Sequence, residues 1–274
     1  MLTCEAIGYS LLSECLFEKF FLLIGPGANG KSVLLDVLIH LLGKEQTAGV
    51  QPSQFGNRFQ RAHLFGKLIN VVTELSEGLE IPDGELKSIV SGEMTTVEFK
   101  HRDPFNIFPF ATCWFASNHL PRTRDFSPAF FRRAIVIPFN RIFSETEQDE
   151  RLKDKLREEL TGILNLSLEA MKGVFLRGHF TKTASSEVVV KEWRIESDQV
   201  QQFAMECCRF GPGLKELSGS LYQAYTEWAR QAGIKKVVNR NNFTARMNRL
   251  GAESSKGTGG ARLLSGVCLE KEAA

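Results

Sequence analysis

The chain has 274 residues, of which 43% are hydrophobic and 24% charged, and its formal net charge is +2. This composition excludes a disordered chain, and the length fits one large domain or two smaller ones. The near-neutral charge leaves any nucleic-acid binding to local basic patches. No apolar run approaches the roughly 18 residues of a membrane span, the N-terminus has no basic leader, and no cysteine pair has zinc-site spacing. We expect a cytoplasmic protein with free thiols and no membrane partner.

Four short apolar runs in the first half have the length of β-strands. They are bounded by Gly, Pro or polar residues and cover Phe20–Ile24, Leu68–Thr73, Ala111–Ala116 and Ala134–Phe139. After the first run, Ser32–Leu42 is rich in Leu and Val and is followed by Gly43, a frequent helix stop. A strand, a Gly-rich turn and a helix in this order predict the opening of a parallel α/β sheet.

The pattern changes after Phe139, and we expect a core over residues 1–143, a helical segment over 144–197 and a separate α+β module over 198–274. Ser144–Phe175 has helical spacing, with Ser144 or Thr146 as a cap and an apolar face of Leu152, Leu156, Leu160, Ile163 and Leu164. Thr181–Ser186 is predicted to be a loop. The last part is predicted to hold two or three short helices, a Gly-rich stretch at Gly257–Gly260 and a strand at Gly266–Leu269.

The segment Gly25–Ser32 matches the pattern G-x-x-x-x-G-K-S between a predicted strand and a predicted helix. Glycines let the backbone N–H groups point at phosphates, the lysine reaches the β- and γ-phosphates, and the serine hydroxyl ligates Mg²⁺. The alternative is a tight turn with an incidental lysine. The pattern predicts ATP and Mg²⁺ as ligands, with nucleotide-binding residues Gly25, Pro26, Gly27, Ala28, Asn29, Gly30, Lys31, Ser32 and Val33.

A carboxylate at the end of a neighbouring strand is required to act on Mg²⁺ and water. Glu74 follows the second apolar run and is assigned that role, with a water-mediated metal contact beside Ser32. Because Thr73 stands before it, direct coordination by a second acid is not expected. The alternative is a solvated glutamate at a strand end.

Polar residues also flank the other two runs. Asn118 ends the third run, where its amide is predicted to sense the γ-phosphate or the water; the alternative is a turn residue that caps the following loop. Arg132 and Arg133 precede the fourth run, and at least one is predicted to reach the phosphate of a neighbouring subunit. The alternative is a solvated strand edge.

The order of these motifs resembles superfamily 3 helicases, in particular the helicase part of phage and plasmid primase–helicases and the related poxvirus-type NTPases. The similarity is carried by Gly25–Val33, Val71–Glu74, Leu86–Glu93, and Trp114–Pro121 with Phe131–Arg133. It implies an AAA+-like P-loop NTPase core, a homo-hexamer and action on single-stranded or forked DNA. Ser91–Glu93 departs from the Gly-Gly-Asp that is usual in the family.

The resemblance also implies DNA-binding residues in and beside a β-hairpin. The matching stretch is Thr95–Pro104, whose β-branched and aromatic residues suit a hairpin and whose Lys100, His101 and Arg102 place charge at its tip. An ordinary basic surface turn is the alternative. Lys87 matches the lysine that the family has in the preceding block.

The C-terminal part resembles the winged-helix module that follows the helicase in such proteins. Asn239–Leu250, with Arg240, Arg246 and Arg249, would be its recognition helix, and Gly257–Gly260 the tip of its wing. The alternative is that these arginines form only a solvated face of the helix and do not contact DNA. Tyr222, Tyr225 and Trp228 have the helical spacing of a core stripe.

The sequence therefore predicts an ATP-dependent DNA helicase or translocase of phage or plasmid-type replication, with a primase on a separate polypeptide as a further partner. Two alternatives remain open. One is a small-molecule P-loop kinase or NTPase that works as a monomer. The other is a nucleotide-binding replication factor that does not unwind DNA. The presence of a single acid, Glu74, after the second strand is consistent with this alternative.

Overall fold

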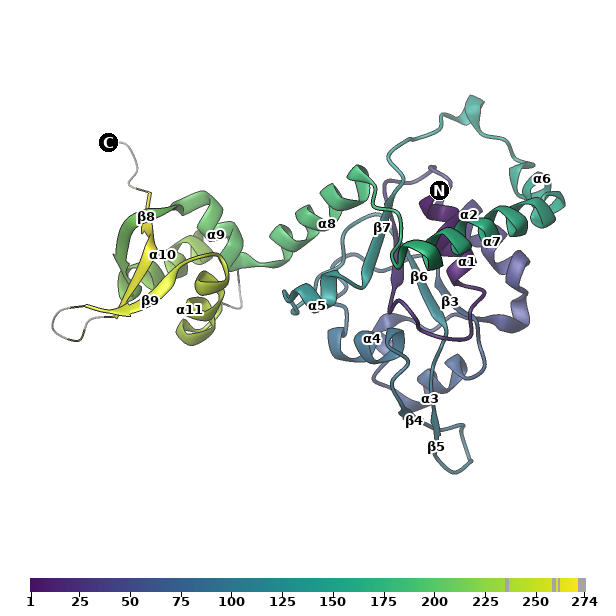
Figure 1. Ribbon diagram of the computed structural model, residues 1–274, viewed down its shortest axis with the longest axis horizontal. Coiled ribbons are helices and arrows are strands. Elements are labelled where there is room, and N and C mark those ends of the chain that lie inside the picture. The colour runs from purple at the N-terminus through teal and green to yellow at the C-terminus, as the bar shows by residue number, and fades with distance from the viewer. Residues whose placement is uncertain (235–236, 258–259, 261, 271–274) are drawn as a thin grey trace. The chain divides into compact units, whose positions relative to one another are not determined.

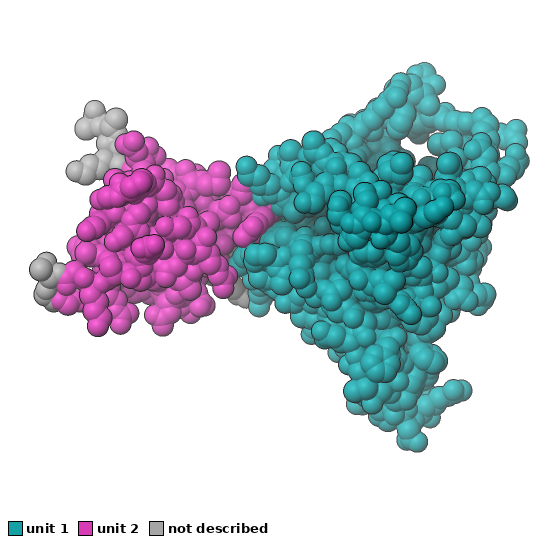
Figure 2. Space-filling view, viewed as in Figure 1, with its two compact units in different colours: residues 1–193 teal, residues 194–274 magenta. Residues whose placement is uncertain are grey.

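The computed structural model describes residues 1–234, 237–257, 260 and 262–270. The chain divides into two compact units, Met1–Trp193 and Arg194–Ala274, which are coloured separately in Figure 2. Each unit has its own buried hydrophobic core, and each is described by itself below. None of the helices in the described part of the chain combines the length and the hydropathy that a membrane span requires.

The larger unit is built on a parallel sheet with the strand order β2-β3-β6-β1-β7 (Figure 1). Its strands are β1 (Phe20–Ile24), β2 (Thr47–Ala48), β3 (Ile69–Val72), β6 (Thr112–Ser117) and β7 (Ala134–Pro138). Each of the four predicted apolar runs forms one strand, which confirms the parallel α/β sheet. The two-residue β2 at the edge is too short to leave a sequence pattern.

Helices bury both faces of this sheet, which is why its strands are continuous apolar runs. Phe21 and Leu23 of β1 pack with α1 (Leu2–Tyr9), α2 (Lys31–Leu42) and α7 (Leu160–Arg177). Phe20 and Leu22 face the other way and pack with α4 (Asp83–Val90), α5 (Pro128–Phe131) and Trp193 of α8 (Ala184–Ser197). The predicted helix after the first strand is α2, and it ends at Gly43 as expected, with a φ of 93°.

Ser144–Phe175 is mostly helical, as its spacing predicts, but it does not form one continuous helix. The segment forms a 3-10 turn at Glu145–Glu147, then α6 (Leu152–Glu158) and α7. Ser144 begins the 3-10 turn, where its backbone N–H donates to Glu147 at 3.0 Å. The buried stripe of α7 is Ser167, Ala170, Met171 and Val174, which continues the predicted apolar face, since Leu160, Ile163 and Leu164 are half-buried and Ile163 packs on the same core.

Two other boundaries also differ from the predictions. Thr181–Ser186 is not wholly a loop, since α8 begins at Ala184 and the Thr183 hydroxyl accepts a hydrogen bond from the Ser186 N–H at 3.3 Å. Ser and Thr that cap a helix give the same sequence pattern as a polar loop.

The hairpin is formed by β4 (Thr95–Val97) and β5 (Phe105–Ile107), so its second strand lies beyond Pro104. The unit also contains α3 (Arg58–Arg61) and 3-10 turns at Lys44–Gln46, Pro52–Gln54 and Ala62–Leu64.

The smaller unit packs three helices on an antiparallel sheet with the order β8-β10-β9. Its elements are α9 (Gln199–Cys207), β8 (Cys208–Leu217), α10 (Ser218–Gln231), α11 (Arg240–Arg249), β9 (Glu253–Lys256) and β10 (Arg262–Leu269). Two or three short helices and a strand at Gly266–Leu269 were predicted; the strand begins earlier, at Arg262, and β9 was not predicted. β8 was missed because Gly211, Pro212 and Gly213 interrupt it, which an edge strand tolerates. Tyr225 is fully buried, and Tyr222 and Trp228 pack against the same core.

Candidate functional site

The Gly-rich loop 25–30 joins β1 to α2 in a conformation that requires glycine at its first position. Gly25 has a φ of 150°, and a Cβ there would lie 2.2 Å from the backbone oxygen of Phe139. Asn29, near the end of the loop, binds the same Phe139 oxygen, since its side-chain Nδ2 donates a hydrogen bond to it at 2.8 Å. The loop is therefore fastened to the end of β7. Among the described residues no side chain caps the first turn of α2, which leaves its N–H groups to an anionic ligand.

Lys31, the first residue of α2, turns its ammonium group back over this loop. Its Nζ donates to the backbone oxygens of Gly25 at 2.5 Å and Pro26 at 2.9 Å, and to the side-chain oxygens of Asn29 and Asn118, both at 3.2 Å. Burial lowers the pKa of Lys31. The structure thus brings together two predicted site residues, Lys31 and Asn118, that are far apart in the sequence.

The remaining predicted carboxylate lies at the same edge of the sheet. β3, β6 and β1 are parallel neighbours, so the segments that follow them meet at their carboxyl ends. The backbone N–H of Leu75 donates to the Ala116 oxygen at 2.9 Å, which fixes the segment carrying Glu74 beside β6. Glu74 and Ser32 are both exposed there. Loop 25–30, Glu74 and Asn118 therefore form one candidate nucleotide site.

Arg132 and Arg133 lie at the opposite edge, because they precede β7 instead of following it. The Phe20 N–H, at the start of β1, donates to the Arg133 oxygen at 2.9 Å. A strand of this length separates the two edges by roughly 16 Å. Neither arginine is therefore brought to the loop of its own chain.

The two arginines differ in their surroundings. The guanidinium of Arg133 is buried and donates to Ala129 O at 2.7 Å, Ser91 Oγ at 2.9 Å and the Glu18 carboxylate at 2.7 Å. The side chain of Arg132 is 63% exposed and contacts the same carboxylate at 3.2 Å. Glu18 was not anticipated from the sequence, where its only signal is its position two residues before the first strand.

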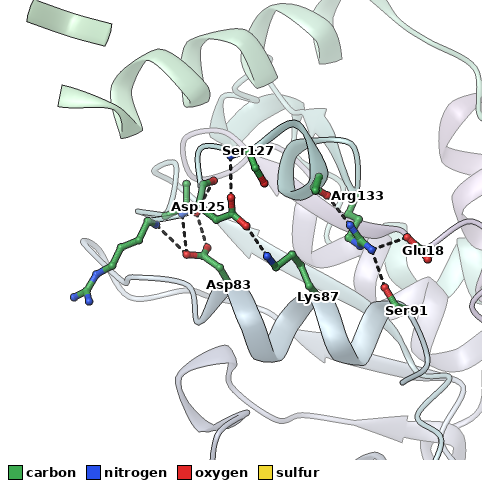
Figure 3. Close-up of polar contacts among 10 residues, drawn as sticks. Glu18, Asp83, Lys87, Ser91, Asp125, Ser127 and Arg133 are labelled. Atoms are coloured by element: carbon green, nitrogen blue, oxygen red, sulfur yellow. Dashed lines mark hydrogen bonds and ion pairs between the residues drawn. The ribbon is translucent and has the colours of Figure 1, made fainter. Parts of the chain in front are cut away.

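Lys87, predicted to bind DNA, is part of a polar network between α4 and the segment that follows Asn118 (Figure 3). Its Nζ donates to Asp125 Oδ2 at 2.6 Å. Burial would raise the pKa of Asp125, but hydrogen bonds from Lys87 and Ser127 outweigh it and hold that pKa below its usual value. Asp83, one turn earlier on α4, has its pKa raised by burial despite three hydrogen bonds. Neither acid was anticipated from the sequence.

The other DNA-binding candidates lie in the loop between β4 and β5. Lys100, His101 and Arg102 are all exposed, and His101 has a φ of 63°. The base of the hairpin is held by α3, since Arg58 Nε pairs with Glu98 at 2.8 Å and Arg61 donates to Thr96 O at 2.9 Å. The tip thus presents a cluster of basic side chains on an anchored hairpin.

The predicted recognition helix is α11, with Asn239 as its N-cap. Arg246 points back into its own unit and pairs with Asp198 at 3.0 Å, whereas Arg240 and Arg249 are exposed. The predicted wing tip, Gly257–Gly260, falls in part outside the described residues.

Three comparisons with known proteins find similar sequences or folds. Residues 23–133 match the model of DUF5906, a family of unknown function. This match covers less than half of the chain, begins inside β1, includes the candidate residues between Gly25 and Arg133 and ends at Arg133.

Among curated proteins, a "putative helicase" of Acanthamoeba polyphaga mimivirus is 26% identical over 164 residues. The alignment covers 53% of this chain and 16% of the viral protein, so the chain spans a small part of that relative's length.

Among solved structures, the A form of the apo NrS-1 C-terminal region has a TM-score of 0.58 with 15% identity, covering 96% of this chain and 70% of that one. A second apo structure of the region has a TM-score of 0.55 with 14% identity, covering 97% of this chain and 71% of that one. At this level of identity the likeness concerns the fold.

Proposed function

We propose that this chain is the ATP-hydrolysing part of a DNA helicase or translocase with a superfamily 3, P-loop type core. The observation that supports this most directly is the contact of Lys31 with Asn118 above a loop that only glycine can begin. Nucleotide phosphates fit against this loop, because the first turn of α2 has no side-chain cap among the described residues and a lysine lies beside it. The helicase-like relative supports DNA as the partner.

Each candidate residue is proposed to have its own role in ATP hydrolysis. Lys31 exchanges its carbonyl partners for phosphate oxygens, and Asn118, already bonded to Lys31, orients the γ-phosphate or the attacking water. Glu74 polarises that water. Ser32 and Glu74 are the residues that would hold Mg²⁺, the latter through water; the ion would neutralise charge on the phosphates.

Arg132 is proposed to act on the nucleotide of a neighbouring subunit. Its position at the edge opposite its own loop favours a reaction shared between subunits, as in a hexameric ring. The basic tip at Lys100–Arg102 is the proposed contact to single-stranded DNA, and the smaller unit is proposed to be a winged-helix module. A primase on another polypeptide would complete the replication machinery.

The first test is the ATPase rate with and without single-stranded DNA, with molecular mass measured by light scattering in the same samples. We expect DNA-stimulated turnover in a particle of about six chains. A DNA-indifferent monomer that hydrolyses ATP would instead support a small-molecule NTPase. DNA binding without turnover would support a replication factor that does not hydrolyse nucleotide.

Glu74→Gln tests the assigned base, and Glu77→Gln, an exposed acid on the same segment, is its control. We expect Glu74→Gln to lower kcat by roughly 10²- to 10⁴-fold with little change in KM, because only the water-polarising carboxylate is lost. Glu77→Gln should retain wild-type turnover. Equal kcat values for Glu74→Gln and the wild type would exclude Glu74 as the base.

A further inference from the structure

α4 presents three polar side chains that are spaced one helical turn apart. Asp83, Lys87 and Ser91 follow one another at intervals of four residues, so they share one face of the helix or its C-terminal cap. Each of them binds the segment 123–133, which ends in the two arginines (Figure 3).

Asp83 holds the start of this segment. Its carboxylate accepts hydrogen bonds from the Thr123 hydroxyl at 2.5 Å and from the backbone N–H groups of Arg124 and Asp125, both at 3.0 Å. Two consecutive N–H groups bound to one carboxylate fix the backbone direction at that point.

Lys87 holds the middle through Asp125. The two oxygens of Asp125 are used separately, since Oδ2 accepts from Lys87 at 2.6 Å and Oδ1 accepts from the Ser127 N–H at 2.8 Å. Ser127 is the N-cap of α5, the short helix that leads into Arg132. The ion pair therefore determines where α5 begins.

Ser91 holds the end of the segment, because Arg133 Nη2 donates to its hydroxyl at 2.9 Å. Arg133 in turn contacts Glu18, which also meets Arg132. With both ends and the middle fastened to α4, the exposed side chain of Arg132 projects from a fixed base.

We infer that Lys87 is a positioning residue, which acts through Asp125 to place Arg132, and is not a direct DNA contact. The inference rests on the proposed function, since it assigns Arg132 a role in ATP hydrolysis. A lysine paired with a carboxylate at 2.6 Å adds no net local charge, and a DNA phosphate would have to displace Asp125 from it.

The test is a double-mutant cycle on Lys87→Met and Asp125→Asn. Met keeps the apolar stem of the lysine, and Asn keeps an acceptor for Ser127 while leaving the charge of Lys87 intact. We expect each single variant to lower kcat by roughly 10- to 100-fold with KM for ATP unchanged, because Arg132 is misplaced while the loop of its own chain is untouched. The double variant should be no worse than either single one, and Lys87→Arg should restore most of the rate.

The second readout is the salt dependence of the dissociation constant for single-stranded DNA. Lys87→Met should leave the slope of this dependence unchanged, whereas Lys100→Met, at the hairpin tip, should reduce it by about 1. A reduced slope in Lys87→Met with a wild-type slope in Asp125→Asn would identify Lys87 as a DNA contact and overturn the inference.

The rate measurements separate the inference from the proposed function. Additive losses in the cycle, or unchanged kcat in both single variants of an active protein, would overturn the inference alone. A wild-type protein that neither hydrolyses ATP nor binds DNA would remove the proposed function and the inference with it. Melting temperatures near that of the wild type show that each variant is folded.

Discussion

Arg132 and Arg133 are adjacent in the sequence but occupy different environments. The side chain of Arg133 is 11% exposed and has partners on three segments, whereas that of Arg132 is 63% exposed. Both terminal nitrogens of the buried Arg133 guanidinium have partners, although its Nε has none among the described residues, so Arg133 serves as a structural residue. An arginine that must reach another subunit has to be exposed, as Arg132 is.

This contrast predicts opposite effects of two alanine substitutions. Arg133→Ala should lower the free energy of unfolding by roughly 2 kcal/mol, an estimate reduced because its partner Glu18 is partly solvated. Arg132→Ala should change it by less than about 0.5 kcal/mol yet abolish most turnover. Urea unfolding and ATPase rates on the same samples check this. An Arg133→Ala variant as stable as the wild type would contradict the assigned structural role.

The site residues at the carboxyl edge could be predicted because each follows a readable strand. The G-x-x-x-x-G-K-S pattern, Glu74 and Asn118 all stand where an apolar run ends, and parallel strands place such positions at one edge. The partners of Lys87 could not be predicted. The spacing of Asp83, Lys87 and Ser91 is visible in the sequence, but nothing local indicates that Asp125 and Arg133 fold back onto that face.

At the level of elements, the strands were easier to predict than the helices after residue 143. Strands buried on both faces give continuous apolar runs, as in Phe20–Ile24. α7 instead approaches α1 where Gly8 lies against Ser167, while Leu166 and Leu168 remain 64% and 50% exposed. The predicted apolar face over Leu160, Ile163 and Leu164 continues into the buried stripe one turn later, but there the stripe includes Ser167 and Ala170, which a search for leucines passes over.

The close approach of α1 and α7 gives a prediction with a matched control. A Cβ on Gly8 would lie 2.4 Å from the Ser167 backbone oxygen, so Gly8→Ala should force the helices apart and lower the free energy of unfolding by roughly 1–3 kcal/mol. Gly162, in α7, faces open space, since no atom of the described residues outside its own helical turn lies within 4 Å of the place that a Cβ would take. Gly162→Ala should therefore raise stability by roughly 0.5–1 kcal/mol. Denaturant unfolding followed by circular dichroism distinguishes the two, and equal stabilities would show that the helices adjust without cost.

At the scale of the whole molecule, the residues predicted to act in hydrolysis do not all lie together in a single chain. Loop 25–30, Glu74 and Asn118 share one edge of the sheet, and Arg132 lies at the other. If Arg132 acts in hydrolysis, it must do so from a second copy, through an interface that joins two different surfaces of the chain. Such head-to-tail contacts close into rings when the rotation between copies permits it.

Mixing two inactive variants tests this arrangement directly. Lys31→Ala removes the phosphate-binding lysine but keeps Arg132, and Arg132→Ala keeps the lysine. In a randomly mixed assembly with equal amounts, about one quarter of the interfaces would join an intact loop to an intact Arg132, so activity should return to about that fraction of wild type if the sites act independently. Either variant alone, at the same total concentration, is the control. If the mixture stays as inactive as its components although light scattering shows mixed assemblies, Arg132 does not complete the site of a neighbour, and the exposed arginine would have to serve another purpose.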